Sequence, residues 1–241
     1  MERLDEKSPI ALYIQLRNIL IDKIKSGQWK VNDKIPTERE LCDMYNVSRA
    51  TVRLALQELE RDGYIYRKQG RGTFVAPPKI EQNITHFYSF SEEMKKRGLV
   101  PSSKILGFEV IKSDKKLADI LNLKEGDEVL SLKRLRLANG EPIMLETSYL
   151  PYNMCRDMTR EDVEKMSLYE ALRTKCGIIP NSADETFEPV LTNSYEAEVL
   201  NYEAGKPALL LERITYSFGT PIEYNKGIVR GDRCKYRVSL K

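Results

Sequence analysis

The chain has 241 residues, of which 41% are apolar and 31% are charged, a composition typical of a soluble globular protein with one or two domains. No apolar run reaches the ~18–20 residues that a membrane-spanning helix needs, and the N-terminus lacks the apolar segment of a signal peptide. The net charge of +3 is uneven: residues 1–78 hold 14 Lys and Arg against 11 Asp and Glu, whereas residues 79–241 hold 25 of each. The excess positive charge therefore belongs to the first third of the chain.

The cysteines and the single histidine argue against a metal site. Cys42, Cys155, Cys176 and Cys234 lie far apart and show no Cys-x-x-Cys spacing. Such thiols are typical of a protein in the reducing cytoplasm, where they serve as small apolar side chains. His86 is the only histidine, so the ligand spacing of a zinc site is missing, and we expect no cofactor.

The first predicted element in the chain is an amphipathic helix over residues 10–25. Its apolar side chains recur at i, i+4, i+7, i+8 and i+12, which places them on one face of a helix. These side chains are Leu12, Leu16, Ile19, Leu20 and Ile24.

Two short helices follow, and each has a start signal. Thr37 can cap the first, and Glu40, three residues later, completes a capping box. Ser48 can cap the second, and Gly63 lies where a helix end favours a left-handed residue. The apolar face of the second helix consists of Val52, Ala55, Leu56 and Leu59.

The opposite face of the second helix carries Arg49, Arg53 and Gln57, which recur every four residues, with Ser48 and Thr51 near its start. Arginine can bind guanine through two hydrogen bonds, glutamine can bind adenine in the same way, and hydroxyl groups suit phosphates. A solvated charged face has the same pattern, so the helix alone leaves both interpretations open.

A basic hairpin comes next. Residues 64–66 and 72–75 read as paired strands, and the segment between them is Arg67, Lys68, Gln69, Gly70 and Arg71. Cations neutralise phosphates, and glycines allow the backbone to approach a groove closely. Helices followed by such a hairpin have the order of a winged helix-turn-helix.

Segments 36–41, 47–56 and 67–75 resemble the DNA-binding domain of the GntR family of bacterial transcription regulators, and the resemblance covers about residues 8–76. It implies a function in binding double-stranded operator DNA. The DNA-contacting positions of the family then fall on Arg39, Ser48, Arg49, Thr51, Arg53, Gln69, Gly70 and Arg71.

Residues 78–85 are predicted to be a linker between a DNA-binding domain, 1–77, and a second domain, 86–241, since paired prolines and polar residues interrupt regular structure. In the second domain, Asn139-Gly140 is a strong hairpin signal, and the mixed pattern predicts an antiparallel α+β domain. The predicted strands are 104–112, 128–137, 141–150, 184–192, 207–217, 221–230 and 234–240, and the predicted helices are 88–97, 115–123, 160–166, 168–175 and 193–200.

A candidate anion pocket follows from Arg134 and Arg136, which project to the same face of one strand. Two neighbouring guanidinium groups need an anion, which a phosphate or carboxylate ligand can supply. Pairing with surface carboxylates is the alternative. Ser89 and Ser91 lie at a predicted helix start, where hydroxyls and free amides suit a phosphate.

Further polar residues complete the candidate pocket. Ser167 lies at another predicted helix start, and Glu146 and Glu223 on neighbouring strands suit sugar hydroxyls or an amine.

Segments 88–94, 133–143, 146–151, 167–169 and 219–223 resemble the UTRA effector domain of the HutC-type GntR regulators, including repressors of N-acetylglucosamine utilisation. The resemblance implies an α+β chain in which the winged helix-turn-helix is joined to an antiparallel-sheet domain with a chorismate-lyase-like fold. Its implied effector-binding residues are Ser89, Ser91, Arg134, Arg136, Glu146, Ser167, Tyr169 and Glu223.

The expected function is that of a cytoplasmic, homodimeric repressor of a sugar or amino-sugar utilisation operon, modulated by a phosphorylated sugar. One alternative is a regulator that responds to a non-sugar carboxylate or an amino-acid metabolite. A lyase-like enzyme is the other, although the sequence offers no nucleophile–base pair.

Overall fold

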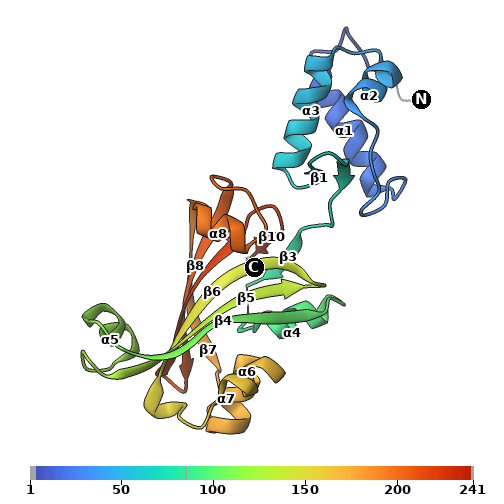
Figure 1. Ribbon diagram of the computed structural model, residues 1–241. Helices are drawn as coiled ribbons and strands as arrows, with labels where there is room; N and C mark the ends of the chain where they lie inside the picture. Colours follow the sequence, from blue (N-terminus) through green and yellow to red (C-terminus); the bar gives the residue numbers. More distant parts are fainter. Residues whose placement is uncertain (1–3, 85, 240–241) are drawn as a thin grey trace. The chain divides into compact units, whose positions relative to one another are not determined.

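The structure is a computed structural model that describes residues 4–84 and 86–239, and the chain divides into two compact units, Met1–Ile80 and Glu81–Lys241 (Figure 1). Each unit has its own hydrophobic core. Among the described residues, no helix is long and apolar enough to cross a membrane.

The N-terminal unit is a three-helix bundle with a β-hairpin. Both predicted helix starts are confirmed: Thr37 and Glu40 form a capping box, and the Ser48 side chain accepts a hydrogen bond from the Thr51 amide. Gly63 follows the third helix with φ +79°. The elements are α1 (Leu12–Lys25), α2 (Glu38–Tyr45), α3 (Arg49–Arg61), β1 (Ile65–Lys68) and β2 (Gly72–Val75).

The core of this unit lies between α1, α3 and the hairpin. All four residues of the predicted apolar face of α3 are buried. In α1, Leu16 and Leu20 are buried as the periodicity predicts, but the third buried residue is Ile21 and not Ile19. Most of the stability of α3 thus comes from its apolar face, which leaves its other face exposed.

The C-terminal unit is built on a six-stranded antiparallel sheet with the strand order β4-β5-β6-β9-β8-β7 (Figure 1). The predicted Asn139-Gly140 hairpin is confirmed, since both residues have positive φ between β5 and β6. The sheet strands are β4 (Pro101–Lys112), β5 (Glu128–Ala138), β6 (Glu141–Pro151), β7 (Ser182–Leu191), β8 (Pro207–Ser217) and β9 (Thr220–Arg230). The helices are α4 (Phe90–Lys96), α5 (Lys115–Leu121), η1 (Tyr152–Met154), α6 (Arg160–Lys165), α7 (Leu168–Cys176) and α8 (Ser194–Val199).

Helices cover both faces of the sheet, because its side chains alternate between one apolar cluster on one face and two on the other. Leu130, Leu132 and Leu150 pack against α6 and α7 on one face. Val129 packs against α5, and Leu135 packs near α8, on the other face. The even-numbered positions of β5, which include Arg134 and Arg136, therefore share the face of α6 and α7.

The predicted linker over 78–85 is wrong in part, because it contains β3 (Ile80–Asn83), which forms a two-stranded sheet with β10 (Cys234–Arg237). The stretch is polar because Glu81 forms ion pairs with Lys235 and Arg237, at 2.6 and 3.1 Å, while Gln82 points inward and is buried. The polar stretch is therefore a strand and not a linker, and its partner β10 lies about 150 residues later in the sequence. The last linker residue, Thr85, and Leu240 of the predicted final strand lie outside the described residues.

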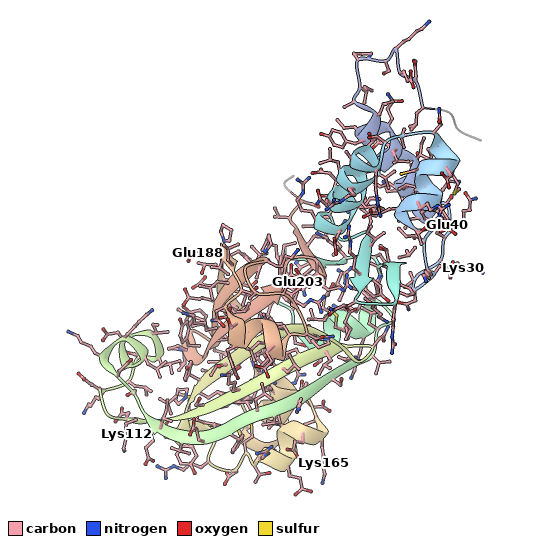
Figure 2. All side chains as sticks on the ribbon, turned by 45° about the horizontal axis from the view of Figure 1, so that its top comes forward. Lys30, Glu40, Lys112, Lys165, Glu188 and Glu203 are labelled. Atoms are coloured by element: carbon pink, nitrogen blue, oxygen red, sulfur yellow. The ribbon has the colours of Figure 1, made fainter. Side chains whose placement is uncertain are left out.

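Most charged side chains of the C-terminal unit are exposed to solvent, but a few are buried. Lys112, Lys165 and Glu203 project outward with side chains about two-thirds to three-quarters exposed (Figure 2). By contrast, Arg134 and Glu146 are buried. Burying charged groups is costly unless they are paired, so these two buried residues indicate a candidate binding site.

Candidate functional site

The exposed face of α3 presents the predicted DNA-reading residues. Arg49, Arg53 and Gln57 are exposed, whereas the other face of the helix is buried. Arg49 has one weak ion pair, 3.4 Å from Glu38, and its side chain remains 77% exposed. Thr51 is half-buried beside the Ser48 hydroxyl, 2.9 Å away.

The remaining predicted DNA contacts are also accessible. Arg39 is exposed on the first turn of α2, and Gln69, Gly70 and Arg71 form the exposed tip of the β1–β2 hairpin. Within the described residues, Arg39, Arg53 and Arg71 form no ion pair with a carboxylate.

The other described arginines of the N-terminal unit pair with carboxylates. Arg17 pairs with Asp62, Arg61 pairs with Glu58, and Arg67 pairs with Glu60. Among the described arginines of this unit, those without an ion pair are thus Arg39, Arg53 and Arg71, all predicted DNA-contacting residues that can neutralise phosphates.

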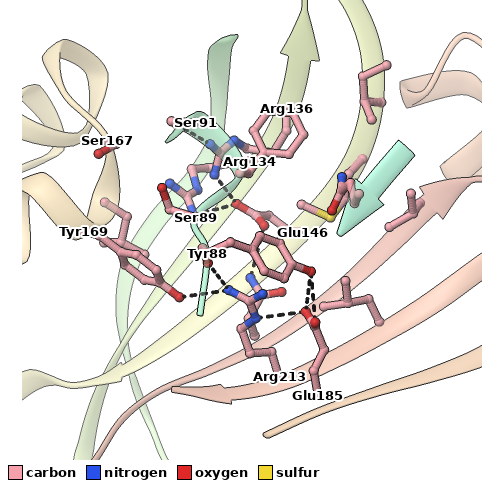
Figure 3. A pocket seen from close by; sticks show the side chains of 18 of the residues that line it. Tyr88, Ser89, Ser91, Arg134, Arg136, Glu146, Ser167, Tyr169, Glu185 and Arg213 are labelled. Carbon is pink, nitrogen blue, oxygen red and sulfur yellow. Dashed lines mark hydrogen bonds and ion pairs between the residues drawn. The ribbon is translucent and has the colours of Figure 1, made fainter. Parts of the chain in front are cut away.

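The C-terminal unit holds a polar pocket with an empty volume of about 610 Å³, including the part that opens to solvent (Figure 3). All eight residues predicted to bind an effector line this pocket: Ser89, Ser91, Arg134, Arg136, Glu146, Ser167, Tyr169 and Glu223. Residues up to 134 positions apart in the sequence, Ser89 and Glu223, therefore meet at one site.

Arg134 and Arg136 share one carboxylate at the centre of the pocket. Oε1 of Glu146 lies 2.5 Å from Nη2 of Arg134 and 2.8 Å from Nη1 of Arg136. Glu146 is directly opposite Arg134 in the β5–β6 register, and its side chain is 5% exposed. Pairing with carboxylates on a solvated surface, the alternative for these arginines, is therefore wrong. Two cations with one carboxylate leave one net positive charge. The Nε atoms of both arginines are buried and have no hydrogen-bond partner among the residues that the structure describes.

The arginines fix the ionisation of Glu146. Burial alone raises the pKa of this carboxyl, but the guanidinium groups of Arg134 and Arg136 outweigh burial and hold its pKa below the ordinary value. Burial lowers the pKa of Arg134, although an arginine keeps its charge at neutral pH. The three groups are therefore charged together.

Hydroxyl groups surround the arginine pair. Arg136 donates a hydrogen bond to Ser91 Oγ at 2.9 Å and lies over the Phe90 ring. Ser89 caps α4, which begins two residues later than predicted for this reason, and Ser167 caps α7. These hydroxyls and the arginines provide donors suited to an anionic oxygen.

Sequence reasoning missed the other end of the pocket, where Arg213 connects three segments. Its Nε lies 2.9 Å from Glu185, its Nη1 donates to the Tyr88 carbonyl at 2.8 Å, and its guanidinium lies 4.2 Å from the Tyr88 ring centre. The Tyr88 hydroxyl donates to Glu185 at 2.9 Å. Arg213 and Thr215 are two residues apart on β8, as Arg134 and Arg136 are on β5, so both project to one face of the sheet. This i, i+2 spacing of polar residues could have identified Arg213 as a pocket residue.

A third carboxylate, Glu223, is held by hydroxyl groups. Its Oε2 accepts hydrogen bonds from Tyr169 and Thr215, both at 3.0 Å. Within the described residues, no cation lies within ion-pair distance of Glu223. Glu223 can therefore accept hydrogen bonds from a ligand hydroxyl or amine.

We expect Tyr88→Phe to lower the free energy of unfolding by about 1.5 kcal/mol, since it removes a hydrogen bond to the charged Glu185 while keeping the ring beside Arg213. Urea denaturation measures the change. Tyr216→Phe is the matched control, because it removes a similar bond to Asp184 at an exposed site and should change stability little. Equal effects of the two variants would contradict a structural role for Tyr88.

Comparisons with known proteins agree with both units. Residues 12–75 match the bacterial regulatory proteins of the gntR family, and residues 96–235 match the UTRA domain. The chain is 36% identical to the HTH-type transcriptional repressor NagR of Bacillus subtilis strain 168, over 95% of both proteins. It is 29% identical to the histidine utilization repressor of Pseudomonas putida, over 94% of this chain and 91% of that protein.

A solved structure shows the same fold. The crystal structure of PhnF from Mycobacterium smegmatis aligns with a TM-score of 0.64 at 31% identity, over 96% of this chain and 99% of PhnF. The predicted α+β class, with a winged helix-turn-helix and an antiparallel effector domain, is thereby confirmed. The chain belongs to the GntR family of bacterial regulatory proteins, with a UTRA domain, and is a ligand-responsive DNA-binding transcription regulator.

Proposed function

We propose that this regulator is a homodimeric repressor of a sugar or amino-sugar utilisation operon, and that a phosphorylated sugar bound in the UTRA pocket modulates its affinity for operator DNA. Amino-sugar phosphates are the first candidates. The observation that carries the choice is the buried Arg134–Glu146–Arg136 cluster, which has more positive than negative charge. The similarity to a repressor, NagR, supports repression and not activation.

The chemistry of the pocket fits the two parts of such a molecule. The phosphate would lie against Arg134, Arg136 and the hydroxyls of Ser89 and Ser91, which supply charge-assisted hydrogen bonds. The sugar would extend toward Tyr169, Ser167 and Glu223, where hydroxyl and carboxylate groups can bind its hydroxyls or amine.

The proposed mode of control requires two DNA-binding units. Helix-turn-helix dimers read two half-sites separated by about one helical turn or a multiple of it. An effector can change operator affinity only if it binds one arrangement of the dimer more tightly than another. A regulator of chromosomal operons would act in the bacterial cytoplasm. Bound to DNA, Arg39, Ser48, Arg49, Thr51, Arg53, Gln69, Gly70 and Arg71 would form the contacts.

Titration of candidate effectors into the protein–operator complex tests the proposal, with an operator selected from random-sequence duplexes. We expect glucosamine 6-phosphate or a related sugar phosphate to change operator affinity by at least tenfold. The unphosphorylated sugar is the matched control and should have no effect at the same concentration. If no sugar phosphate changes DNA affinity, the effector class is wrong.

A second candidate effector class is a carboxylate or an amino-acid metabolite, which the 29% identity to a histidine utilization repressor favours. A carboxylate could also bind the arginine pair, while Glu223 could accept an ammonium group. Histidine and its deamination product belong in the same titration. A response to these compounds and not to sugar phosphates would select this alternative.

A further inference from the structure

The two-stranded sheet of β3 and β10 forms one wall of the polar pocket (Figure 1). Gln82 of β3 and Tyr236 of β10 both line the pocket. The Tyr236 ring packs against Phe187 of β7, with ring centres 4.5 Å apart, which attaches the pair of strands to the six-stranded sheet. Two strands alone are only marginally stable in water, so contacts made by their pocket-facing side chains contribute to holding them in place.

Gln82 is the buried polar residue of this wall. It is 4% exposed and points inward, whereas its neighbour Glu81 pairs with Lys235 and Arg237 on the outer face. The amide group of a glutamine can donate two hydrogen bonds and accept two. Among the residues that the structure describes, the Gln82 side chain has no hydrogen-bond partner. Buried polar side chains nearly always have one, so this amide indicates a partner that enters the pocket.

Asn225, a second carboxamide in the pocket, shows the contrast. Its amide donates hydrogen bonds to Oε2 of Glu146 at 3.2 Å and to Oγ of Ser148 at 3.0 Å. Asn225 therefore belongs to the hydrogen-bond network that holds the Glu146 carboxylate in place. Gln82 lines the same pocket outside that network, which leaves its donors and its acceptor available to a ligand. A carboxamide complements a hydroxyl group, because each can both donate and accept a hydrogen bond.

We propose that Gln82 is an effector-contacting residue whose amide forms a hydrogen bond with a hydroxyl group of the bound sugar phosphate. The inference rests on the proposed function, from which it takes the class of effector, and it adds a residue to the eight predicted from the sequence. The strand that carries Gln82 begins at Ile80, the last residue of the N-terminal unit. A ligand bound to Gln82 therefore stabilises the first strand that follows the DNA-binding unit.

The stability of full-length, effector-free Gln82→Met gives the first test. Methionine has nearly the volume of glutamine but no amide, and replacing a buried polar group that has no protein partner removes no hydrogen bond. We expect the midpoint of urea denaturation to be equal to that of wild type or higher. A clearly lower midpoint would show that the amide supports the fold, which overturns the proposal.

Calorimetric titration of the same proteins with glucosamine 6-phosphate and with inorganic phosphate gives the second test. Gln82→Met should bind glucosamine 6-phosphate about 2- to 13-fold more weakly, as expected for the loss of one hydrogen bond. Its affinity for inorganic phosphate should be unchanged, since that anion lacks the sugar hydroxyl groups. Glu81→Gln is the matched control on the outer face of the same strand and should bind both compounds as wild type does.

Hydrogen exchange of the backbone amides of β3 and β10 gives an independent readout. Glucosamine 6-phosphate should slow their exchange in wild type and in Glu81→Gln, and should slow it less in Gln82→Met. Equal slowing in all three proteins would overturn the stabilisation of β3 by a ligand at Gln82.

The remaining outcomes separate this inference from the proposed function. Equal affinity of wild type and Gln82→Met for glucosamine 6-phosphate overturns the Gln82 contact and leaves the effector class intact. An equal loss in Glu81→Gln would show that the integrity of the two strands is responsible, and weaker binding of inorganic phosphate by Gln82→Met would show a disturbed arginine pair; either result overturns the contact. If wild type binds neither glucosamine 6-phosphate nor glucose 6-phosphate, the effector class is wrong and the inference that rests on it is overturned as well.

Discussion

Replacing Arg49 and Arg53 together by alanine is expected to abolish sequence-specific operator binding. Both side chains are exposed on the face of α3 opposite its buried stripe, and they lie one helical turn apart. Each arginine that binds a guanine through two hydrogen bonds contributes about 1–3 kcal/mol of discrimination. Their joint loss, about 2–6 kcal/mol, should therefore reduce the preference for operator over random DNA by about 30-fold to 2 × 10⁴-fold.

The measurement compares the affinity for a selected operator with that for a random-sequence duplex at one salt concentration. The double variant should keep weak binding to both duplexes, because the proposed phosphate contacts of the hairpin and α2 are unchanged. Arg61→Ala is the matched control on the same helix, since Arg61 is 64% exposed but paired with Glu58. If the double variant still prefers the operator as wild type does, α3 is not the reading element.

The parts of the fold that were predictable depend on local signals. Thr37, Glu40 and Ser48 fix the helix starts through hydrogen bonds within three residues, so their sequence spacing was sufficient. The Asn139-Gly140 hairpin was equally local. The β3–β10 pairing was not predictable in this way, because it joins segments about 150 residues apart and β3 carries a polar outward face.

Local sequence spacing predicted the position of the pocket residues but not the contacts between them. The i, i+2 spacing of Arg134 and Arg136 correctly placed both on one face of a strand. It could not reveal that Glu146, which we expected to bind a sugar, already pairs with both arginines. The i, i+2 spacing of Arg213 and Thr215 could place both on one face of β8, but the pairing of Arg213 with Glu185 depends on the register of β7 against β8, which no local pattern specifies.

Replacing Glu146 by glutamine is expected to lower the free energy of unfolding of the effector-free protein by about 3–5 kcal/mol at neutral pH, because two buried arginines lose their shared carboxylate. Urea denaturation measures the loss. Glu164→Gln, which breaks a half-exposed ion pair with Arg160, should cost less than about 1 kcal/mol. Inorganic phosphate should stabilise Glu146→Gln more than wild type, since an anion can replace the carboxylate.

The pH dependence of this effect has a definite sign. The pKa of Glu146 is lower in the folded chain than its ordinary value of about 4.3, so its ionised form stabilises the fold above that pH. This contribution is lost as pH falls through the folded-state pKa. The stability difference between wild type and Glu146→Gln should therefore be constant near neutral pH and shrink below pH ~4. A difference that does not change on acidification would mean that Glu146 is not ionised in the folded protein.

The double variant Arg134→Met, Glu146→Gln separates stability from effector binding. It removes one cation and one carboxylate together, so the net charge of the pocket is unchanged and most of the lost stability should return. Operator affinity without effector should match wild type, since the DNA-contacting residues are intact. Affinity for the phosphorylated effector should fall by about 10–150-fold, because one charge-assisted contact contributes about 1.5–3 kcal/mol. An unchanged effector affinity would show that the anionic group binds elsewhere, and the arginine pair would then be a structural element of the sheet.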